Sequence, residues 1–159
     1  VFDFHQEVDG ALEMRLGRNK IGTTKKGIGP AYASKISRNG VRVGDLGDWN
    51  YFEQRFRAVA EHHMRSYEGL EINVEEELAF YKSVADRVAS MTVDTIDYTN
   101  QQYQEGKKIL VEGANATMLD IDFGTYPFVT SSNPSIGSVL TGLGVSPRKL
   151  RGIYGTVKS

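Results

Sequence analysis

Apolar residues repeat with helical spacing through the middle of the chain, and this pattern constrains the fold more than any other feature. In residues 51–66, one face of an amphipathic helix comprises Phe52, Phe56, Val59 and His63. A second helix starts near Asn73, and its apolar stripe comprises Leu78, Tyr81, Ala85 and Val88. Asn50 is followed after three residues by Glu53, and Asn73 by Glu76, which is the spacing of a capping box. We therefore expect two long amphipathic helices.

Shorter patterns make the prediction a mixed α/β fold. Further helices are expected at about 3–19, 31–39, 96–105 and 135–142. Lys108-Ile109-Leu110-Val111 is a continuous apolar run between charge and glycine, typical of a buried parallel strand, and another strand is expected near 152–157. The helical subregion then covers about 31–106, and the sheet-associated part covers about 107–159.

The small number of strands limits what the chain can build alone. Two parallel strands do not form a stable sheet by themselves. The residues at the two ends, Val1–His5 and Gly152–Lys158, are also typical of the interior of a folded protein. We therefore expect residues 1–159 to be an internal segment of a single larger α/β domain, mostly helical with two or more strands.

Charge and composition exclude several classes of function. The 19 basic and 20 acidic side chains give a net charge of −1, which argues against nucleic-acid binding through bulk electrostatics. No apolar run approaches the length of a membrane span, so no membrane partner is expected. The chain has no cysteine, which excludes disulfides and thiolate metal sites and fits the reducing cytoplasm.

A glycine-rich loop at residues 21–30 is a candidate phosphate site. Gly22 and Gly27 have P-loop spacing, but Ile28-Gly29 replaces the required lysine and hydroxyl residue, and the dinucleotide pattern fails as well. What remains is a set of anion-binding groups: the glycine amides, Thr23, Thr24, Lys25 and Lys26. A solvated turn is the alternative. Lys35 and Arg38, three residues apart on the next expected helix, would add a basic face beside the loop.

A second candidate site lies at Thr130-Ser131-Ser132-Asn133, directly before the helix expected at 135–142. The amino end of a helix binds anions, and plain N-capping, which needs one of these side chains, is the alternative. Asp120 and Asp122 could form a paired-carboxylate site, although we favour a structural role. The histidines, His5, His62 and His63, are not expected to bind metal.

Two long motifs resemble one enzyme family, the adenylosuccinate synthetases. The first is Gly27-Ile28-Gly29-Pro30-Ala31-Tyr32, followed by Lys35 and Arg38. The second is Val111-Glu112-Gly113-Ala114-Asn115, followed by Leu119–Pro127 and Val129–Asn133. The resemblance covers essentially the whole chain. Asn115, where bacterial members typically have glutamine, is similar to the eukaryotic members.

The resemblance implies a GTP-dependent, homodimeric ligase with a P-loop-NTPase-like parallel sheet. It would join IMP and L-aspartate into adenylosuccinate, with Mg²⁺ as cofactor. By the same resemblance, IMP would be bound by Thr24, Asn115 and Thr130, and by Arg38 from across the dimer interface.

The resemblance also implies what the segment lacks. The family's Gly-Asp-Glu-Gly-Lys-Gly loop, its histidine acid and its guanine reader do not occur in the 159 residues. We therefore expect no catalytic residue and no metal ligand in this segment, and no synthetase activity from it alone. The rival hypotheses are a non-catalytic nucleotide-binding or dimerisation fragment and a different phosphate-binding enzyme.

Overall fold

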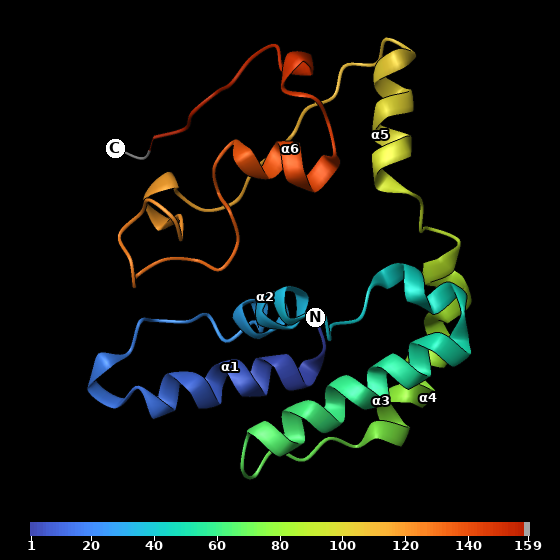
Figure 1. Cartoon of the computed structure of the whole chain (residues 1–159), viewed down its shortest axis with the longest axis vertical. Coiled ribbons are helices and arrows are strands. Elements are labelled where there is room, and N and C mark those ends of the chain that lie inside the picture. Colours follow the sequence, from blue (N-terminus) through green and yellow to red (C-terminus); the bar gives the residue numbers. More distant parts are fainter. Residues whose placement is uncertain (158–159) are drawn as a thin grey trace.

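The computed structural model describes residues 1–157, and within this range the regular structure is helical. The α-helices are α1 (Asp3–Arg15), α2 (Ile28–Ser37), α3 (Trp49–Ser66), α4 (Val74–Ala89), α5 (Thr95–Gln104) and α6 (Gly137–Leu143). Short 3₁₀ turns lie at Gly17–Asn19, Val43–Gly47, Thr117–Leu119 and Pro147–Lys149. In Figure 1, α1 lies beside α2 and α3 beside α4, while α5 leads away from these four helices to α6 and the C-terminal segment.

The core lies where α1, α3 and α4 meet. The apolar face expected on α3 is confirmed, since Phe52, Phe56, Val59 and His63 are all buried. Phe56 is fully buried, and its ring packs edge-on against Phe2, 4.9 Å between centroids. Phe4 of α1 and Leu78 of α4 complete the cluster. Burying aromatic side chains of this size provides most of the stabilisation that such a small core can have.

The helix ends agree with the sequence patterns in one case and differ in another. The cap expected at Asn73 is confirmed, because Glu76 N donates to Asn73 Oδ1 over 3.3 Å. The reciprocal half of the capping box is wrong, because the Glu76 carboxylate accepts from the side-chain Nδ2 of Asn73, over 2.8 Å, and not from its backbone amide. The cap expected at Asn50 is wrong. Asp48 caps α3 instead, accepting from Tyr51 N over 3.1 Å. A carboxylate is as good an N-cap as an amide, so the helix starts at the earlier residue.

Other helix limits shift by a few residues. The helix expected at 3–19 ends at Arg15, and a 3₁₀ turn follows. The helix expected from residue 31 begins at Ile28. The stop expected at Gly106 is confirmed. α5 ends at Gln104 with Glu105 as its C-cap, and Gly106 follows in the left-handed conformation, with φ +78°.

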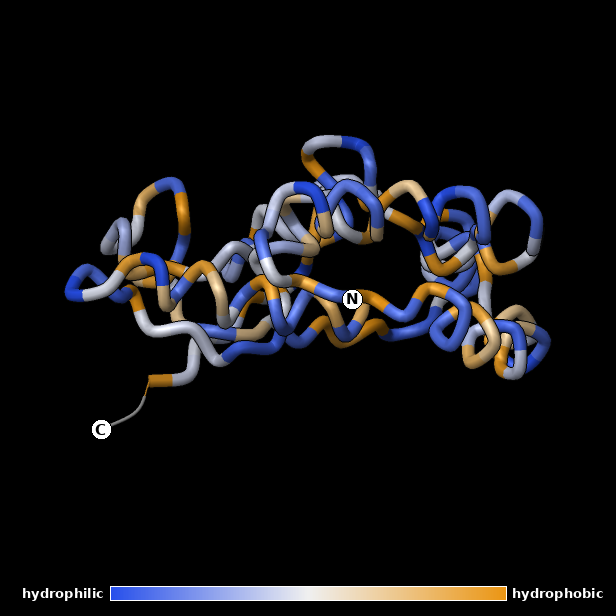
Figure 2. The backbone as a smooth tube through the Cα atoms, turned by 90° about the horizontal axis from the view of Figure 1, so that it is seen from below, coloured by the Kyte–Doolittle hydropathy of each residue, from blue (hydrophilic) through white to orange (hydrophobic). Residues whose placement is uncertain are grey.

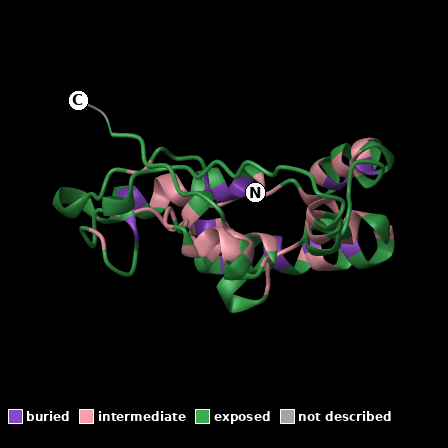
Figure 3. Ribbon diagram, turned by 90° about the horizontal axis from the view of Figure 1, so that it is seen from above, coloured by how far each residue is buried: buried purple, intermediate pink, exposed green. Residues whose placement is uncertain are grey.

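Both expected strands are wrong, because neither 108–111 nor 152–157 has strand structure. A strand is held by hydrogen bonds to a neighbouring strand, and residues 1–157 provide none. The side chains that a sheet would bury are instead exposed, to 89% at Leu110 and 92% at Tyr154. Figure 3 shows this exposure along the C-terminal segment, and Figure 2 shows apolar stretches outside the helices as well as within them. The C-terminal run Gly152–Lys158, which includes this second strand, ends at Lys158, and that residue lies outside the described residues.

A pair of buried histidines predicts loss of stability in acid. His5 and His63 are each only 4% exposed, and their ring centroids lie 5.2 Å apart. Burial, with a smaller contribution from the charge of His63, lowers the pKa of His5 from 6.5 to about 4, and burial also lowers the pKa of His63. The unfolded chain therefore binds protons that the folded chain does not. The stability that this pair provides is complete above pH 6.5 and is lost as the pH falls towards 4.

We expect the free energy of unfolding of the longer protein to fall by roughly 2 kcal/mol between pH 7 and pH 4.5 through these groups. Urea denaturation across this range measures the loss. His5→Gln should flatten the dependence. A matched change at the exposed His62, His62→Gln, should alter it much less, because the charge of His62 is only the smaller cause of the lowered pKa of His63. An equal pH slope in wild type and His5→Gln would contradict this assignment.

Candidate functional site

A cavity of about 1050 Å³ brings the two sequence motifs together. Its walls are α1, the 21–30 loop, α2 along its length, the last turns of α3 and the 114–132 segment. Thr24, Asn115 and Thr130, three of the four residues expected to bind IMP, line this one cavity. Its volume is at the upper end of the range for small-molecule sites and is ample for a nucleotide.

The loop side of the cavity is built on a bend between two glycines in the left-handed conformation. Gly22 has φ +83° and Gly27 has φ +74°. Thr24 and Lys26 line the cavity, so a hydroxyl and a positive charge are available to an anion there. The amides of Gly22 and Gly27 are not available, because they donate to carboxylates of α1. The expectation that the glycine amides would bind the anion is therefore wrong at these two positions.

The amino end of α2 also lies on this cavity. Ile28, Gly29 and Pro30, its first three residues, are among the lining residues. The first amides of a helix have no acceptor within the helix, so this end has a partial positive charge. A Cβ on Gly29 would lie 3.4 Å from Ser131 Oγ, which places the amino end of α2 directly beside the second motif. The two motifs that the sequence suggested separately therefore line one cavity.

The second motif forms a chain of hydroxyls rather than a helix cap. Thr130 Oγ1 and Ser132 Oγ are 2.9 Å apart, and Asn115 Nδ2 donates to Ser132 Oγ over 3.4 Å. The helix expected to begin beside these residues is α6, which begins only at Gly137. None of the residues 130–133 caps this helix, whose N-cap is Ile136, so the N-capping alternative is wrong and the anion site at that helix end stays a prediction. Asn133 uses its side chain to accept from Ser135 N, a local turn of the kind that competes with helix formation.

Asn115 has a left-handed backbone, with φ +70°. It follows residues 108–111, where a strand was expected, and that strand is absent from the described residues. Its position on the cavity depends instead on the turn, because asparagine tolerates this conformation better than most residues. An amide here can hydrogen-bond a ligand without changing its own charge.

Arg38 does not line the cavity. The expectation that it shares a helix face with Lys35 is wrong, because Arg38 ends α2 in the left-handed conformation, with φ +62°. Its carbonyl accepts from Arg55 Nη2 over 3.1 Å, while its side chain is exposed. Lys35 lies over the ring of Tyr32 instead, 5.6 Å from the centroid.

Asp120 has the structural role that we favoured. It is fully buried, and its Oδ1 accepts from Asp122 N over 2.9 Å and from Phe123 N over 3.4 Å. These bonds close the turn that precedes Thr130, whose own amide donates to Leu119 O over 2.8 Å. Asp120 and Asp122 therefore do not form a paired site, and residues 1–157 contain no group of three or more histidines and carboxylates placed to hold a metal ion.

Two carboxylates on α1 belong to the cavity wall and were not expected from the sequence. Asp9 and Glu13 line the cavity and accept hydrogen bonds from the 22–27 loop. The available signal was their spacing, since residues four apart lie on one helix face. His63, expected only on the apolar face of its helix, also lines the cavity, and its Nε2 lies 3.3 Å from Ser34 Oγ.

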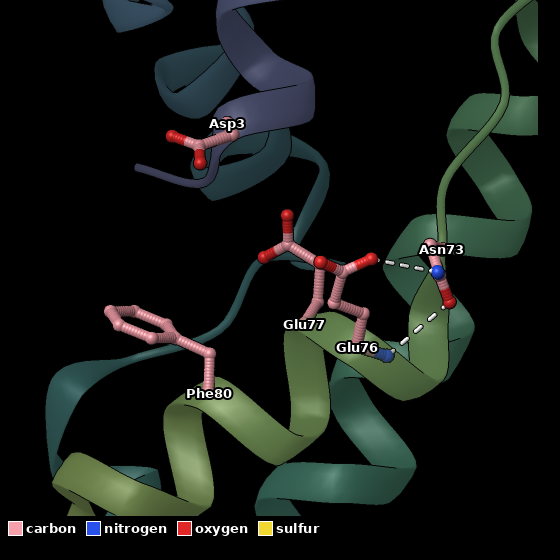
Figure 4. Close-up of a pocket in the computed structure, with 5 residues that line it drawn as sticks. All are labelled: Asp3, Asn73, Glu76, Glu77 and Phe80. Atoms are coloured by element: carbon pink, nitrogen blue, oxygen red, sulfur yellow. Dashed lines mark hydrogen bonds between the residues drawn. The ribbon is translucent and has the colours of Figure 1, made fainter.

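A second, smaller pocket of about 290 Å³ lies between Asp3 and the start of α4. Figure 4 shows Glu76 engaged with Asn73, and the carboxylates of Asp3 and Glu77 on the pocket wall. Three carboxylates repel a phosphate, so this pocket is not a nucleotide site. None of the helices described in residues 1–157 is both long enough and apolar enough to cross a membrane.

Known proteins resemble this chain over its whole length. The family model described as adenylosuccinate synthetase matches residues 1–159. The chain is 78% identical to an adenylosuccinate synthetase of Phaeodactylum tricornutum, matching all of this chain and 30% of that protein. It is 55% identical to a chloroplastic adenylosuccinate synthetase of Ostreococcus tauri, matching all of this chain and 33% of that protein.

A solved structure gives the same result for the fold. A fully ligated adenylosuccinate synthetase from Plasmodium falciparum superposes with a TM-score of 0.91 and 42% identity, covering 95% of this chain and 36% of that one. The chain thus spans about a third of the length of the proteins it matches.

Proposed function

This chain belongs to the adenylosuccinate synthetase family, and we propose that the protein to which it contributes joins IMP and L-aspartate in a GTP-dependent reaction. In this reaction IMP loses its N1 proton to the catalytic base, the 6-oxygen attacks the γ-phosphorus of GTP, and GDP leaves. The amino nitrogen of aspartate then attacks C6 and loses a proton. The C6–O bond breaks, and the 6-oxygen leaves as part of inorganic phosphate. The product is adenylosuccinate.

The observation that most supports this role is the single cavity that joins the two motifs. We assign its loop side to the 5′-phosphate of IMP. Thr24 provides a hydroxyl, Lys26 a positive charge and α2 the amino end of a helix, which together form an anion site. Thr130 adds a hydroxyl at the phosphate end. Asn115, on the same wall, is proposed to contact the purine near its reacting edge, where an uncharged amide can stabilise developing charge.

Arg38 is proposed to act in the partner subunit of a homodimer. Its side chain is exposed and does not line this chain's own cavity, which fits a residue that reaches an IMP molecule held by another subunit. A guanidinium can bind phosphate through two parallel hydrogen bonds.

Residues 1–157 contain no group of three or more histidines and carboxylates that could hold a metal ion. We propose that the Mg²⁺ ligands, the GTP site, the catalytic base and the catalytic acid lie in the rest of a longer protein. There the chain would form an internal segment of one α/β, P-loop-NTPase-like domain, with residues 31–106 as the helical part and 107–159 beside the sheet. Mg²⁺ would neutralise charge on the transferring phosphoryl group.

Full-length protein supplied with IMP, aspartate, GTP and Mg²⁺ should form adenylosuccinate, detected by mass spectrometry. The separate 159-residue chain should form none under the same conditions, because the proposed base and acid are absent from it. Product from the separate chain would contradict the division of the site that we propose. No product from the full-length protein would leave the alternative, a non-catalytic nucleotide-binding or dimerisation protein.

We propose the cytoplasm as the location of the protein, because the 159 residues of this chain contain no cysteine, which fits a reducing compartment. A plastid is the alternative, because the Ostreococcus relative is described as chloroplastic. Fluorescent tagging of the full-length protein distinguishes the two.

A further inference from the structure

Two carboxylates of α1, those of Asp9 and Glu13, accept hydrogen bonds from the 21–30 loop. Asp9 Oδ2 accepts from Thr23 Oγ1 over 2.8 Å and from Gly27 N over 3.1 Å. Glu13 Oε1 accepts from Gly22 N over 2.7 Å. These bonds join residues 9 to 18 positions apart in the sequence, so they fix the loop to a helix and not merely to itself.

The bonds of Asp9 lie on both sides of Thr24. Thr23 Oγ1, which donates to Asp9, also accepts from Lys25 N over 3.1 Å. Gly27, the other donor to Asp9, is the N-cap of α2. One carboxylate oxygen therefore sets both the bend that presents Thr24 and the first residue of the helix whose amino end lies on the cavity. A loop free of these bonds would have to be ordered when the ligand binds, which weakens binding.

We propose that Asp9 is a positioning residue for the nucleotide phosphate, and this proposal rests on the proposed function. Asp9 does not bind the phosphate, because two negative groups repel. It acts through Thr23 and Gly27, and it holds Thr24 and the amino end of α2 in the geometry that receives the 5′-phosphate of IMP.

Steady-state kinetics of the full-length enzyme test this role. Asp9→Ala removes the acceptor, and we expect the KM for IMP to rise about tenfold or more, with kcat and the KM for GTP changed by less than about twofold. Asp9→Asn keeps an oxygen that can accept both hydrogen bonds, so its KM for IMP should stay within about threefold of wild type. Asp86→Ala removes an exposed carboxylate of α4 that does not line the cavity, and it serves as the matched control.

Thr23→Val provides an independent variant if Asp9→Ala does not fold. It leaves α1 intact and removes one of the two bonds to Asp9, so the KM for IMP should rise by about threefold or more. An unchanged KM for IMP in a folded Asp9→Ala or Thr23→Val enzyme would overturn the proposal. Equal increases in both KM values, or no rescue by Asp9→Asn, would also overturn it, because these results indicate a merely structural residue. A wild-type enzyme that does not use IMP would instead refute the proposed function.

Discussion

Gly27→Ala should destabilise the protein by about 3 kcal/mol and weaken IMP binding with it. Gly27 has φ +74°, which disfavours any residue with a Cβ. That Cβ would also lie 2.8 Å from the carbonyl carbon and the Cβ of His5 and 2.9 Å from Gln6 N. The obstructing atoms belong mainly to the backbone of α1, so relief requires the loop and the helix to move apart. Urea denaturation of the full-length protein measures the effect.

Gly22→Ala is the matched control within the same loop. Gly22 also has a positive φ, +83°, but a Cβ added there would meet no atom within 4 Å. Gly22→Ala should lower the free energy of unfolding only by the cost of placing a residue with a Cβ in the left-handed conformation, about 1 kcal/mol. Equal losses in the two variants would show that the close approach of the loop to α1 does not contribute to stability.

Arg38→Leu should reduce the affinity of the full-length enzyme for IMP by about 10- to 100-fold, because one charge-assisted contact to phosphate is lost. Folding should be unaffected, since the side chain is exposed and Arg55 bonds only the Arg38 carbonyl. Activity with IMP at a subsaturating concentration measures the loss.

Mixed dimers separate a role in the partner subunit from a role within one subunit. An Arg38→Leu subunit has an intact cavity, and a Thr130→Val subunit has an intact Arg38. If Arg38 acts across the interface, a hybrid of the two regains one complete site, and an equal mixture recovers up to about a quarter of wild-type activity. No recovery beyond that of the separate variants would contradict a shared site. The Thr130→Val homodimer serves as the control.

The helical half of the fold could be predicted because its signals are local. The apolar face of α3 and the Asn73–Glu76 cap of α4 each depend on residues within a few turns of one another. The strand at 108–111 could not be settled in this way, because a strand exists only where another strand pairs with it. An apolar run such as Ile109–Val111 indicates a preference for burial and not the presence of a partner.

The site was harder to predict than the helices. Thr24 and Thr130 are distant in sequence, and the motif resemblance, not spacing, suggested that they belong together. The spacing of Asp9 and Glu13 placed them on one helix face but could not show what they bind, because the partners of Asp9 are a hydroxyl and a backbone amide, 14 and 18 residues away. Arg38 was placed on a helix face because the pattern could not show that α2 ends there in a left-handed residue.

The central claim is that the loop side of the cavity binds the phosphate of IMP, and calorimetric titration tests it most directly. Wild-type full-length protein and Thr24→Val should each be titrated with IMP and with inosine, which lacks the phosphate. We predict that Thr24→Val weakens IMP binding by about tenfold and leaves inosine binding unchanged. Equal weakening for both ligands, or no change for IMP, would contradict the claim.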